Sequence, residues 1–128
     1  EFVGRLQHTD HGAAQLVALA GDLGGGKTTF TKAIAKIIGI TEDITSPTYV
    51  IQKTYPIDFS GYTQFVHIDA YRLNSGAELL ALNWRETLAD NKNLIFLEWP
   101  ERVEDVLPNN YKKIEFAFIS ENEREIKV

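Results

Sequence analysis

Apolar residues follow two different spacings in the first forty residues, and each spacing predicts one kind of element. Residues 14–20, AQLVALA, form a continuous apolar run that predicts a buried strand. After a glycine-rich stretch, apolar residues recur every three or four positions, which predicts a helix with one buried face. This face consists of Phe30, Ala33, Ile34, Ile37 and Ile38. Gly39 then predicts the end of the helix.

The middle of the chain predicts a pair of strands and a second helix. Residues 49–55 and 63–68 are β-rich, and residues 56–62 between them are rich in turn formers. A connection this short favours antiparallel pairing. Ser75 and Glu78 have the spacing of a capping box and predict the start of a helix. That helix would carry Leu79, Leu80 and Leu82.

The last third of the chain predicts three strands. Residues 93–97 form a short apolar run of the fully buried type, as expected at the centre of a parallel sheet. Residues 111–119 and 124–128 alternate in polarity around a polar turn, so they predict a terminal hairpin. One face of this hairpin carries core residues, namely Ile114, Phe116 and Phe118.

The glycine-rich stretch between the first strand and the first helix is the most informative motif. Residues 21–28, GDLGGGKT, fit the phosphate-loop pattern G-x-x-x-x-G-K-[ST] at every fixed position. A strand, a glycine loop and a helix in this order gather backbone N–H groups at a helix N-terminus, where the helix dipole favours phosphate. We therefore predict a site for a nucleoside triphosphate with Mg²⁺. The loop residues of that site are Asp22, Leu23, Gly24, Gly25, Gly26, Lys27 and Thr28.

Two residues of this loop have separate expected roles. Lys27 would reach the β- and γ-phosphates, and the hydroxyl of Thr28 would bind Mg²⁺. A glycine-rich turn with an incidental lysine is the alternative interpretation. The elements together predict one domain over residues 1–128, with an α/β P-loop NTPase fold. It would have a mostly parallel central sheet flanked by helices, with antiparallel strands and a C-terminal hairpin.

A triphosphatase on this fold also needs a carboxylate at the end of an apolar strand, near the metal and the attacking water. Asp69 and Glu98 both end strand-like runs, and ligands of open α/β sheets bind at that edge. Glu98 fits the support of Mg²⁺ better, because four apolar residues precede it and a turn follows it. Asp69 could bind the metal through water or orient the nucleophile. Each acid could instead cap a helix or pair with an arginine.

Three further features carry weaker signals. Ser46 and Thr48 flank Pro47 after the first helix, where phosphate-loop proteins keep a segment that senses the γ-phosphate, although a simple turn would look the same. His67 has no second ligand at metal-binding spacing and is interpreted as structural. Arg72 could pair with Asp69 or with phosphate.

Composition narrows the functions that the chain could have. The net charge of −5 and the pI near 5.1 argue against a broad basic surface for nucleic acid, so a role on RNA would need a partner. The chain has no cysteine, which excludes disulfides and thiol chemistry. No apolar run approaches the roughly 20 residues of a membrane span, so we expect a soluble cytoplasmic protein without membrane contact.

Four motifs in order give the chain a resemblance to a known family. They are residues 21–30 (GDLGGGKTTF), 45–49 (TSPTY), 67–73 (HIDAYRL) and 97–102 (LEWPER). Together they closely resemble the TsaE (YjeE) family over almost the whole chain. That family is a small bacterial ATPase required for threonylcarbamoyl modification of the adenosine next to the tRNA anticodon. It acts with the TsaB–TsaD pair, in which TsaD transfers the group, and ATP hydrolysis resets that complex.

The resemblance implies ATP and Mg²⁺ as cofactors, the TsaB–TsaD complex as partner, and contact with tRNA only through that complex. It implies Asp69 as a catalytic acid and Glu98 as a second support for Mg²⁺ beside Thr28. It also implies nucleotide contacts by Thr29, Trp99 and Arg124. In the family an additional strand usually precedes a helix at the N-terminus, and we expect this chain to open at Glu1 already inside that N-terminal helix. Family members often carry alanine where Gly25 stands, a change that the loop tolerates.

Other functions of the same fold remain open at this level. A GTPase would normally show Asn-Lys-x-Asp after a strand, but residues 91–94, NKNL, precede the strand and lack the acid. A small-molecule kinase would usually have an arginine-bearing lid, and no arginine-rich insertion is present. An independent nucleotide-dependent switch is a third possibility. We expect an ATPase that is weak without partners, because no arginine finger is evident.

Overall fold

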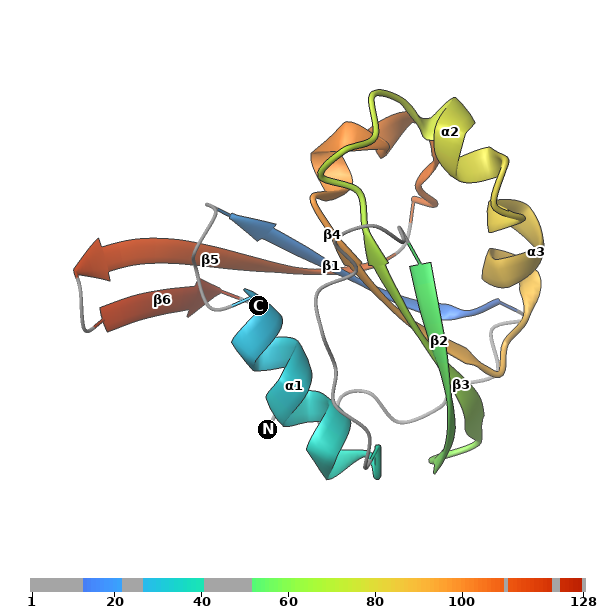
Figure 1. Cartoon of the computed structure of the whole chain (residues 1–128), viewed down its shortest axis with the longest axis horizontal. Helices are drawn as coiled ribbons and strands as arrows, with labels where there is room; N and C mark the ends of the chain where they lie inside the picture. The colour runs from blue at the N-terminus through green and yellow to red at the C-terminus, as the bar shows by residue number, and fades with distance from the viewer. Residues whose placement is uncertain (1–12, 22–26, 41–51, 110, 121–122, 128) are drawn as a thin grey trace.

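The computed structural model describes residues 13–21, 27–40, 52–109, 111–120 and 123–127, and Figure 1 shows the arrangement of these segments. Six strands form one sheet in the order β2-β3-β4-β1-β5-β6. The strands are β1 (Gln15–Gly21), β2 (Gln52–Phe59), β3 (Tyr62–Asp69), β4 (Asn93–Glu98), β5 (Lys112–Ser120) and β6 (Glu123–Lys127).

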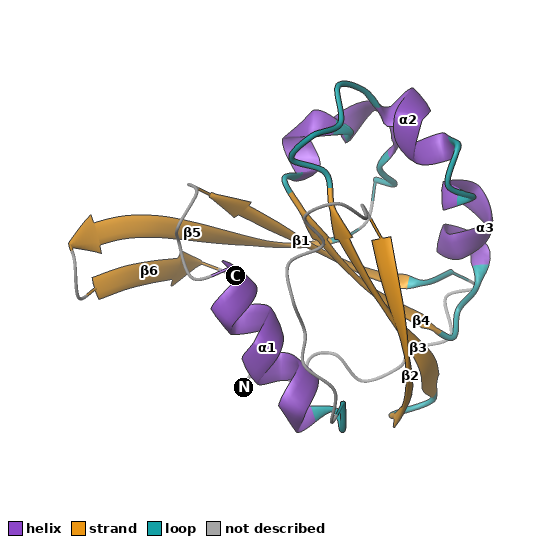
Figure 2. Ribbon diagram, in the orientation of Figure 1, coloured by secondary structure: helices purple, strands orange, loops and turns teal. Residues whose placement is uncertain are grey.

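The centre of the sheet is parallel and both flanks are antiparallel. β3, β4, β1 and β5 run in the same direction, while β2 pairs antiparallel with β3 and β6 pairs antiparallel with β5. Every residue of β4 is buried, as a strand between two parallel neighbours should be. The sheet therefore confirms the predicted mixed α/β fold with its terminal hairpin, and Figure 2 shows helices on either side of it.

Different helices cover the two faces of the sheet. Helix α1 (Lys27–Ile37) packs on one face, which we call the α1 face, against the odd-numbered residues of β1 and β3 and the even-numbered residues of β4. Helices α2 (Gly76–Leu80) and α3 (Trp84–Ala89) pack on the other, the α2–α3 face. Two 3₁₀ turns, η2 (Pro100–Arg102) and η3 (Glu104–Val106), complete the cover of that face.

Helix α1 buries a stripe that differs from the predicted one. Ile34 and Ile38 are buried as expected, and Phe30 packs against the core. Ile37, however, is 58% exposed. Ala33 is exposed too, and the buried positions beside Ile34 and Ile38 are Thr31 and Ala35. Residues at i, i+3, i+4 and i+7 share one face of a helix, and the set that starts at Thr31 faces the sheet.

The end of α1 agrees with the prediction. Gly39 has a φ of +98°, which is the left-handed conformation that glycine adopts readily after a helix. The backbone N–H of Ile40 then donates to the carbonyl oxygen of Ala35 at 2.9 Å. This bond closes the last turn and brings Ile40 back into the core.

The β2–β3 hairpin is longer than its sequence pattern predicted. The expected connection over residues 56–62 is wrong, because β2 continues to Phe59 and only Ser60 and Gly61 form the turn. Both turn residues have positive φ, as tight hairpin turns require. The strand runs through Pro56 because β2 has a single partner strand in the described sheet, and proline is tolerated in such strands. Residues 49–51 of the predicted strand lie outside the described residues.

The predicted capping box at α2 is also wrong in its details. The side chain of Ser75 makes no capping hydrogen bond. Instead, Oε2 of Glu78 accepts from the backbone N–H of Asn74 at 2.7 Å, and Oδ1 of Asp105 accepts from the N–H of Gly76 at 3.1 Å. A Cβ at Gly76 would lie 2.5 Å from the side chain of Val106, so only glycine allows this close approach of α2 to η3. The helix ends before Leu82.

Candidate functional site

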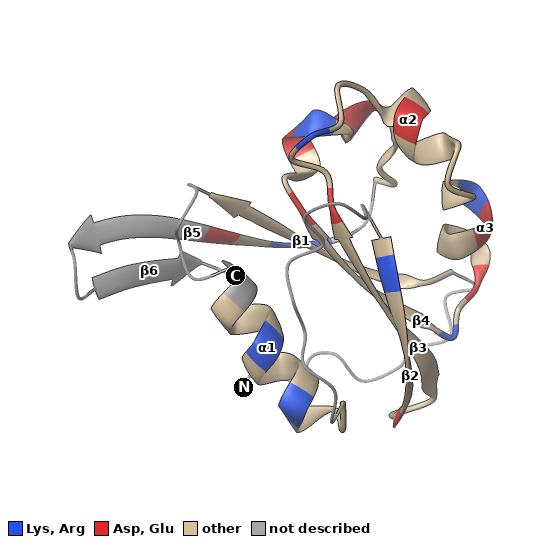
Figure 3. Cartoon of the chain, viewed as in Figure 1, with Lys and Arg blue, Asp and Glu red and all other residues tan. Residues whose placement is uncertain are grey.

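Two acids lie side by side at the carboxyl ends of neighbouring parallel strands. Asp69 is the last residue of β3, Glu98 is the last residue of β4, and the two are register partners. Figure 3 shows acidic positions where these strands lead into the turns beyond the sheet. The expected location of both acids at a strand end is therefore confirmed, whereas their roles in catalysis and metal binding stay predictions.

The strand pleat directs this polar pair to the α1 face. Side chains alternate along a strand, so Asp69 shares a face with Phe65, and Glu98 shares a face with Phe96. Phe65 and Phe96 both belong to the core under α1. Both acids therefore lie on the α1 face, at its carboxyl edge.

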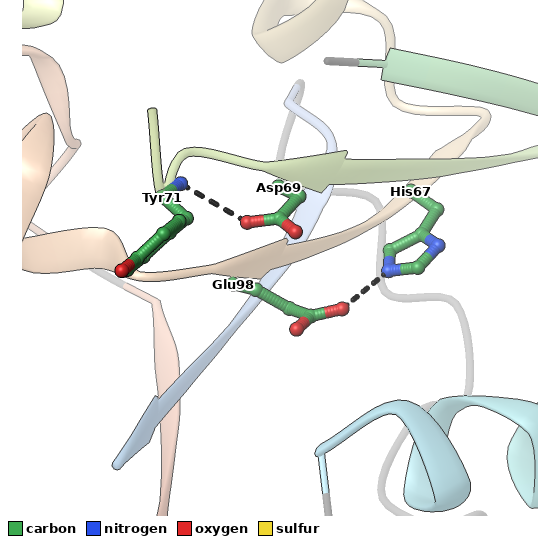
Figure 4. A network of polar contacts seen from close by, with 4 residues as sticks. All are labelled: His67, Asp69, Tyr71 and Glu98. Carbon is green, nitrogen blue, oxygen red and sulfur yellow. Dashed lines mark hydrogen bonds and ion pairs between the residues drawn. The ribbon is translucent and has the colours of Figure 1, made fainter. Parts of the chain in front are cut away.

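His67 lies on the same face as the two acids and contacts Glu98, although its sequence context indicated only a structural role. Its side chain is fully buried, and its Nε2 lies 2.7 Å from Oε2 of Glu98. Glu98 itself is only 3% exposed. Figure 4 shows the imidazole and the carboxylate pointing toward one another. The spacing of His67 and Asp69 indicates that both side chains lie on one face of β3, but the contact with Glu98 follows only from the register of β3 against β4.

Asp69 differs from Glu98 in its surroundings. It is only partly buried, and its Oδ1 accepts from the backbone N–H of Tyr71 at 3.0 Å (Figure 4). The N–H of Ala70 donates to the carbonyl oxygen of Glu98 at 3.0 Å, so the pairing of the two strands extends past Asp69. The loop after β3 is thus fixed to the end of β4.

Trp99 follows Glu98 and lies on the other side of the sheet. Its ring packs against the α2–α3 core and pairs with the ring of Tyr71, with 5.0 Å between the ring centroids. The guanidinium carbon of Arg102 lies 5.5 Å from the centroid of the Tyr71 ring. Trp99 has φ 61° and ψ 53°, a left-handed conformation that is costly for a bulky residue. Its predicted contact with a nucleotide stays a prediction.

The structure describes the two elements on either side of the glycine-rich sequence. β1 ends at Gly21 and α1 begins at Lys27, so residues 22–26 bridge the carboxyl edge of the sheet and the first turn of α1. β1 lies next to β4, with Leu19 as register partner of Glu98, and the backbone N–H of Trp99 donates to the carbonyl oxygen of Leu19 at 3.3 Å. β1 therefore passes directly beside Glu98 and ends two residues later, at Gly21.

The remaining predicted residues are described only in part. Residues 22–26, Ser46 and Thr48 lie outside the described residues. Lys27 and Thr28 are described by their backbone in α1, and Thr29 is exposed in its first turn. Arg124 lies on β6 as register partner of Phe118. Two strands, β1 and β5, separate β6 from β4 in the described sheet, and the predicted nucleotide contact of Arg124 stays a prediction.

The described donors fit a metal that is shared with a ligand. In the described part of the chain, no three His, Cys, Asp or Glu residues gather as a metal-binding group. Mg²⁺ prefers oxygen ligands and is commonly held by one or two carboxylates together with substrate phosphates and water. Glu98 and Asp69 offer carboxylate oxygens at the edge where the loop begins. The arrangement fits that kind of binding and offers no complete protein cage.

Fold and site together define an α/β protein with an acidic site at the carboxyl edge of its parallel strands, next to a strand–loop–helix unit. The model of the family described as "Threonylcarbamoyl adenosine biosynthesis protein TsaE" matches residues 1–126. The chain belongs to the TsaE family.

Individual relatives agree with this family. The chain is 36% identical over 111 residues to the tRNA threonylcarbamoyladenosine biosynthesis protein TsaE of Bacillus subtilis, covering 87% of this chain and 66% of that protein. It is 35% identical over 126 residues to the protein of the same name from Treponema pallidum, covering 98% and 87%. The relative from Streptomyces coelicolor is 41% identical over 96 residues, covering 73% and 63%. The chain thus spans about two thirds of the length of several relatives.

A solved structure supports the same fold. The crystal structure of YdiB from Bacillus subtilis superposes with a TM-score of 0.71 at 30% sequence identity, covering 98% of this chain and 74% of that one. Among the helices described for the chain, none has the length and apolar character needed to cross a membrane.

Proposed function

We propose that this chain is a Mg²⁺-dependent ATPase that serves threonylcarbamoyl modification of tRNA by acting on the TsaB–TsaD complex. One observation carries the proposal. Asp69 and Glu98 are register partners at the carboxyl edge of the sheet, on the face of α1, beside the strand that leads into the phosphate-loop sequence. Family membership supports the biological role, and the edge geometry supports the chemistry.

The proposed reaction is attack of water on the γ-phosphate of ATP. The loop N–H groups and Lys27 would hold the phosphates, and Thr28 and Glu98 would hold Mg²⁺. When bound, Mg²⁺ would neutralise the negative charge that develops in the transition state. Asp69 is more exposed than Glu98 and is the last residue of β3, a position suited to orienting the water. Glu98 is buried, which favours a fixed orientation of its carboxylate.

The partner role is supported by the chemistry of phosphoryl transfer and by the family relationship. Phosphoryl transfer often needs an additional cation to neutralise the transition state, and this cation can come from a second protein. The family relationship makes TsaB and TsaD the expected suppliers of such help. The acidic net charge supports contact with tRNA through these proteins instead of direct binding.

The test is ATP hydrolysis by the chain alone and after addition of TsaB, TsaD and tRNA. Glu98→Gln should keep nucleotide binding and lower hydrolysis at least about a hundredfold, the scale of removing one preorganised charge-stabilising group. Lys27→Ala should abolish nucleotide binding. Two variants at exposed positions, Glu86→Gln on α3 and Lys32→Ala on α1, are matched controls that should change neither quantity.

The outcomes separate the proposal from its alternatives. Strong stimulation by the partners, lost in Glu98→Gln, supports a resetting ATPase. Undiminished hydrolysis in Glu98→Gln would reject the assignment of Glu98. Hydrolysis that ignores partners of proven activity would favour an independent nucleotide-dependent switch. Transfer of phosphate to a small-molecule acceptor instead of water would favour a kinase.

A further inference from the structure

We propose that His67 is a positioning residue that fixes the carboxylate of Glu98 for metal binding. The proposal deepens the proposed function and rests on it, because it assumes that Glu98 acts on Mg²⁺. The family comparison and the sequence pattern assign no such role to His67. The inference comes from the contact between His67 and Glu98 and from their burial.

The sheet register brings the two side chains together. His67 is the register partner of Phe96, and Glu98 lies two residues farther along β4. His67 and Glu98 are therefore diagonal neighbours on one face of the sheet. Diagonal neighbours on adjacent strands are within reach of long side chains. The 2.7 Å between Nε2 and Oε2 is in the range of a strong hydrogen bond to an ionised group.

The chemistry of the pair sets the direction of this bond. An ionised carboxylate can only accept, so the Nε2–H of His67 donates to Oε2 of Glu98. Oε2 is thereby held, and the other carboxylate oxygen points away from the imidazole (Figure 4). A glutamate has several rotatable bonds, and the hydrogen bond favours one orientation, in which the second oxygen is turned away from the imidazole. Hydrogen-bonded partners of metal ligands commonly orient them in this way.

Burial makes the contribution of His67 hard to replace. The ring is fully buried and lies 6.5 Å from the Phe65 ring, centroid to centroid, within the α1 core. Glu98 is almost as deeply buried, so bulk water has little access to take over the bond. Without the imidazole N–H, the buried carboxylate would lose this hydrogen bond and rotate toward other partners. A purely packing role would require only the volume of the ring.

Two substitutions distinguish positioning from packing. His67→Leu replaces the imidazole with an apolar side chain of similar size and removes the donor, whereas His67→Gln keeps an N–H donor. Affinity for a fluorescent ATP analogue in EDTA should stay within about twofold in both. In Mg²⁺, His67→Leu should lower kcat about 10- to 100-fold and raise the half-saturating Mg²⁺ concentration about tenfold, the scale expected when a hydrogen-bonded partner of a metal ligand is replaced. His67→Gln should regain part of each loss.

A double-mutant cycle separates failure of this inference from failure of the proposed function. In a Glu98→Gln background, His67→Leu should have little further effect, because the carboxylate that it orients is already absent. If Glu98→Gln hydrolyses ATP normally, the role that the proposed function gives to Glu98 fails, and the premise of this inference fails with it. If Glu98→Gln loses hydrolysis while His67→Leu keeps wild-type kcat and Mg²⁺ dependence, the positioning role is overturned. An equal further loss in both backgrounds would also overturn it. If His67→Leu does not fold, His67→Asn, which is too short to reach Oε2, takes its place.

Discussion

The two faces of the sheet are built from the same strands but end in different chemistry. On the α1 face, alternate residues of β3 and β4 lead from an aromatic core to His67, Asp69 and Glu98. On the α2–α3 face, the same strands lead to Trp99, which packs against the core there and contacts the exposed ring of Tyr71. One face therefore joins packing to a polar site, and the other mainly closes the core.

The comparison teaches how a small domain can separate stability from function. The α2–α3 face is covered by elements of three to six residues, which could not be stable helices in isolation. They are held by tertiary contacts such as the bond from the indole N–H of Trp84 to the carbonyl oxygen of Val106, at 3.0 Å. Substitutions on this face should alter unfolding, and substitutions on the α1 face should also alter the site.

The largest effect is expected for Trp84→Ala on the α2–α3 face. Trp84 is 1% exposed, so its removal leaves a cavity and an unpaired carbonyl oxygen at Val106. The free energy of unfolding should fall by about 3–5 kcal/mol. Denaturant unfolding measures this loss, and ATP affinity of the folded fraction should not change. A large loss of affinity in protein with a native circular dichroism spectrum would contradict the separation of the two faces.

A smaller loss of stability with a larger loss of function is expected for Phe30→Ala on the α1 face. The Phe30 ring is stacked on Phe96, with 6.4 Å between centroids, and anchors the first turns of α1 to β4. Because Phe30 is only partly buried, the free energy of unfolding should fall by only about 1–3 kcal/mol. ATP affinity should nevertheless fall about tenfold, since a loosened α1 displaces the phosphate loop. Calorimetric titration with ATP would measure the affinity. Unchanged affinity would contradict a link between the packing of α1 and nucleotide binding.

The smallest effect concerns stability at alkaline pH. Tyr62 belongs to the α1 core, and burial raises the pKa of its phenol above the usual value near 10. The unfolded chain then releases this proton at lower pH than the folded chain. Stability should fall as pH rises above about 10, by at most about 1.4 kcal/mol per pH unit. Tyr62→Phe should show a flatter dependence in denaturant unfolding at pH 9 to 11, and Tyr71→Phe is the control. Identical slopes in wild type and Tyr62→Phe would refute the prediction.

Much of the fold and part of the site could be predicted from the sequence. Residues 14–20 and 93–97 are long apolar runs, and such runs have few alternatives to buried parallel strands. Asp69 and Glu98 were found because an acid directly after an apolar run marks a strand end. The C-terminal end of α1 and the terminal hairpin follow from equally local signals.

What was missed depends on contacts between distant segments. The role of Glu78 could not be assigned, because the bond to Asn74 requires the actual path of the chain into α2. The exposure of Ile37 depends on which stripe of α1 meets the sheet, and two stripes were apolar enough. The partner of His67 is 31 residues away, so only the register of β3 against β4 reveals it. Local patterns carry none of this information.

The proline in β2 has a consequence for how the molecule behaves among copies of itself. Of the described strands, β2 lies at one border of the sheet, and a border strand offers unpaired backbone groups to any chain that can extend the sheet. Pro56 presents no N–H, the register shifts between Pro56 and Phe59, and Asp58 adds an exposed charge. The residue that concealed this strand in the sequence therefore also hinders strand addition, and with it the growth of aggregates from this side of the sheet.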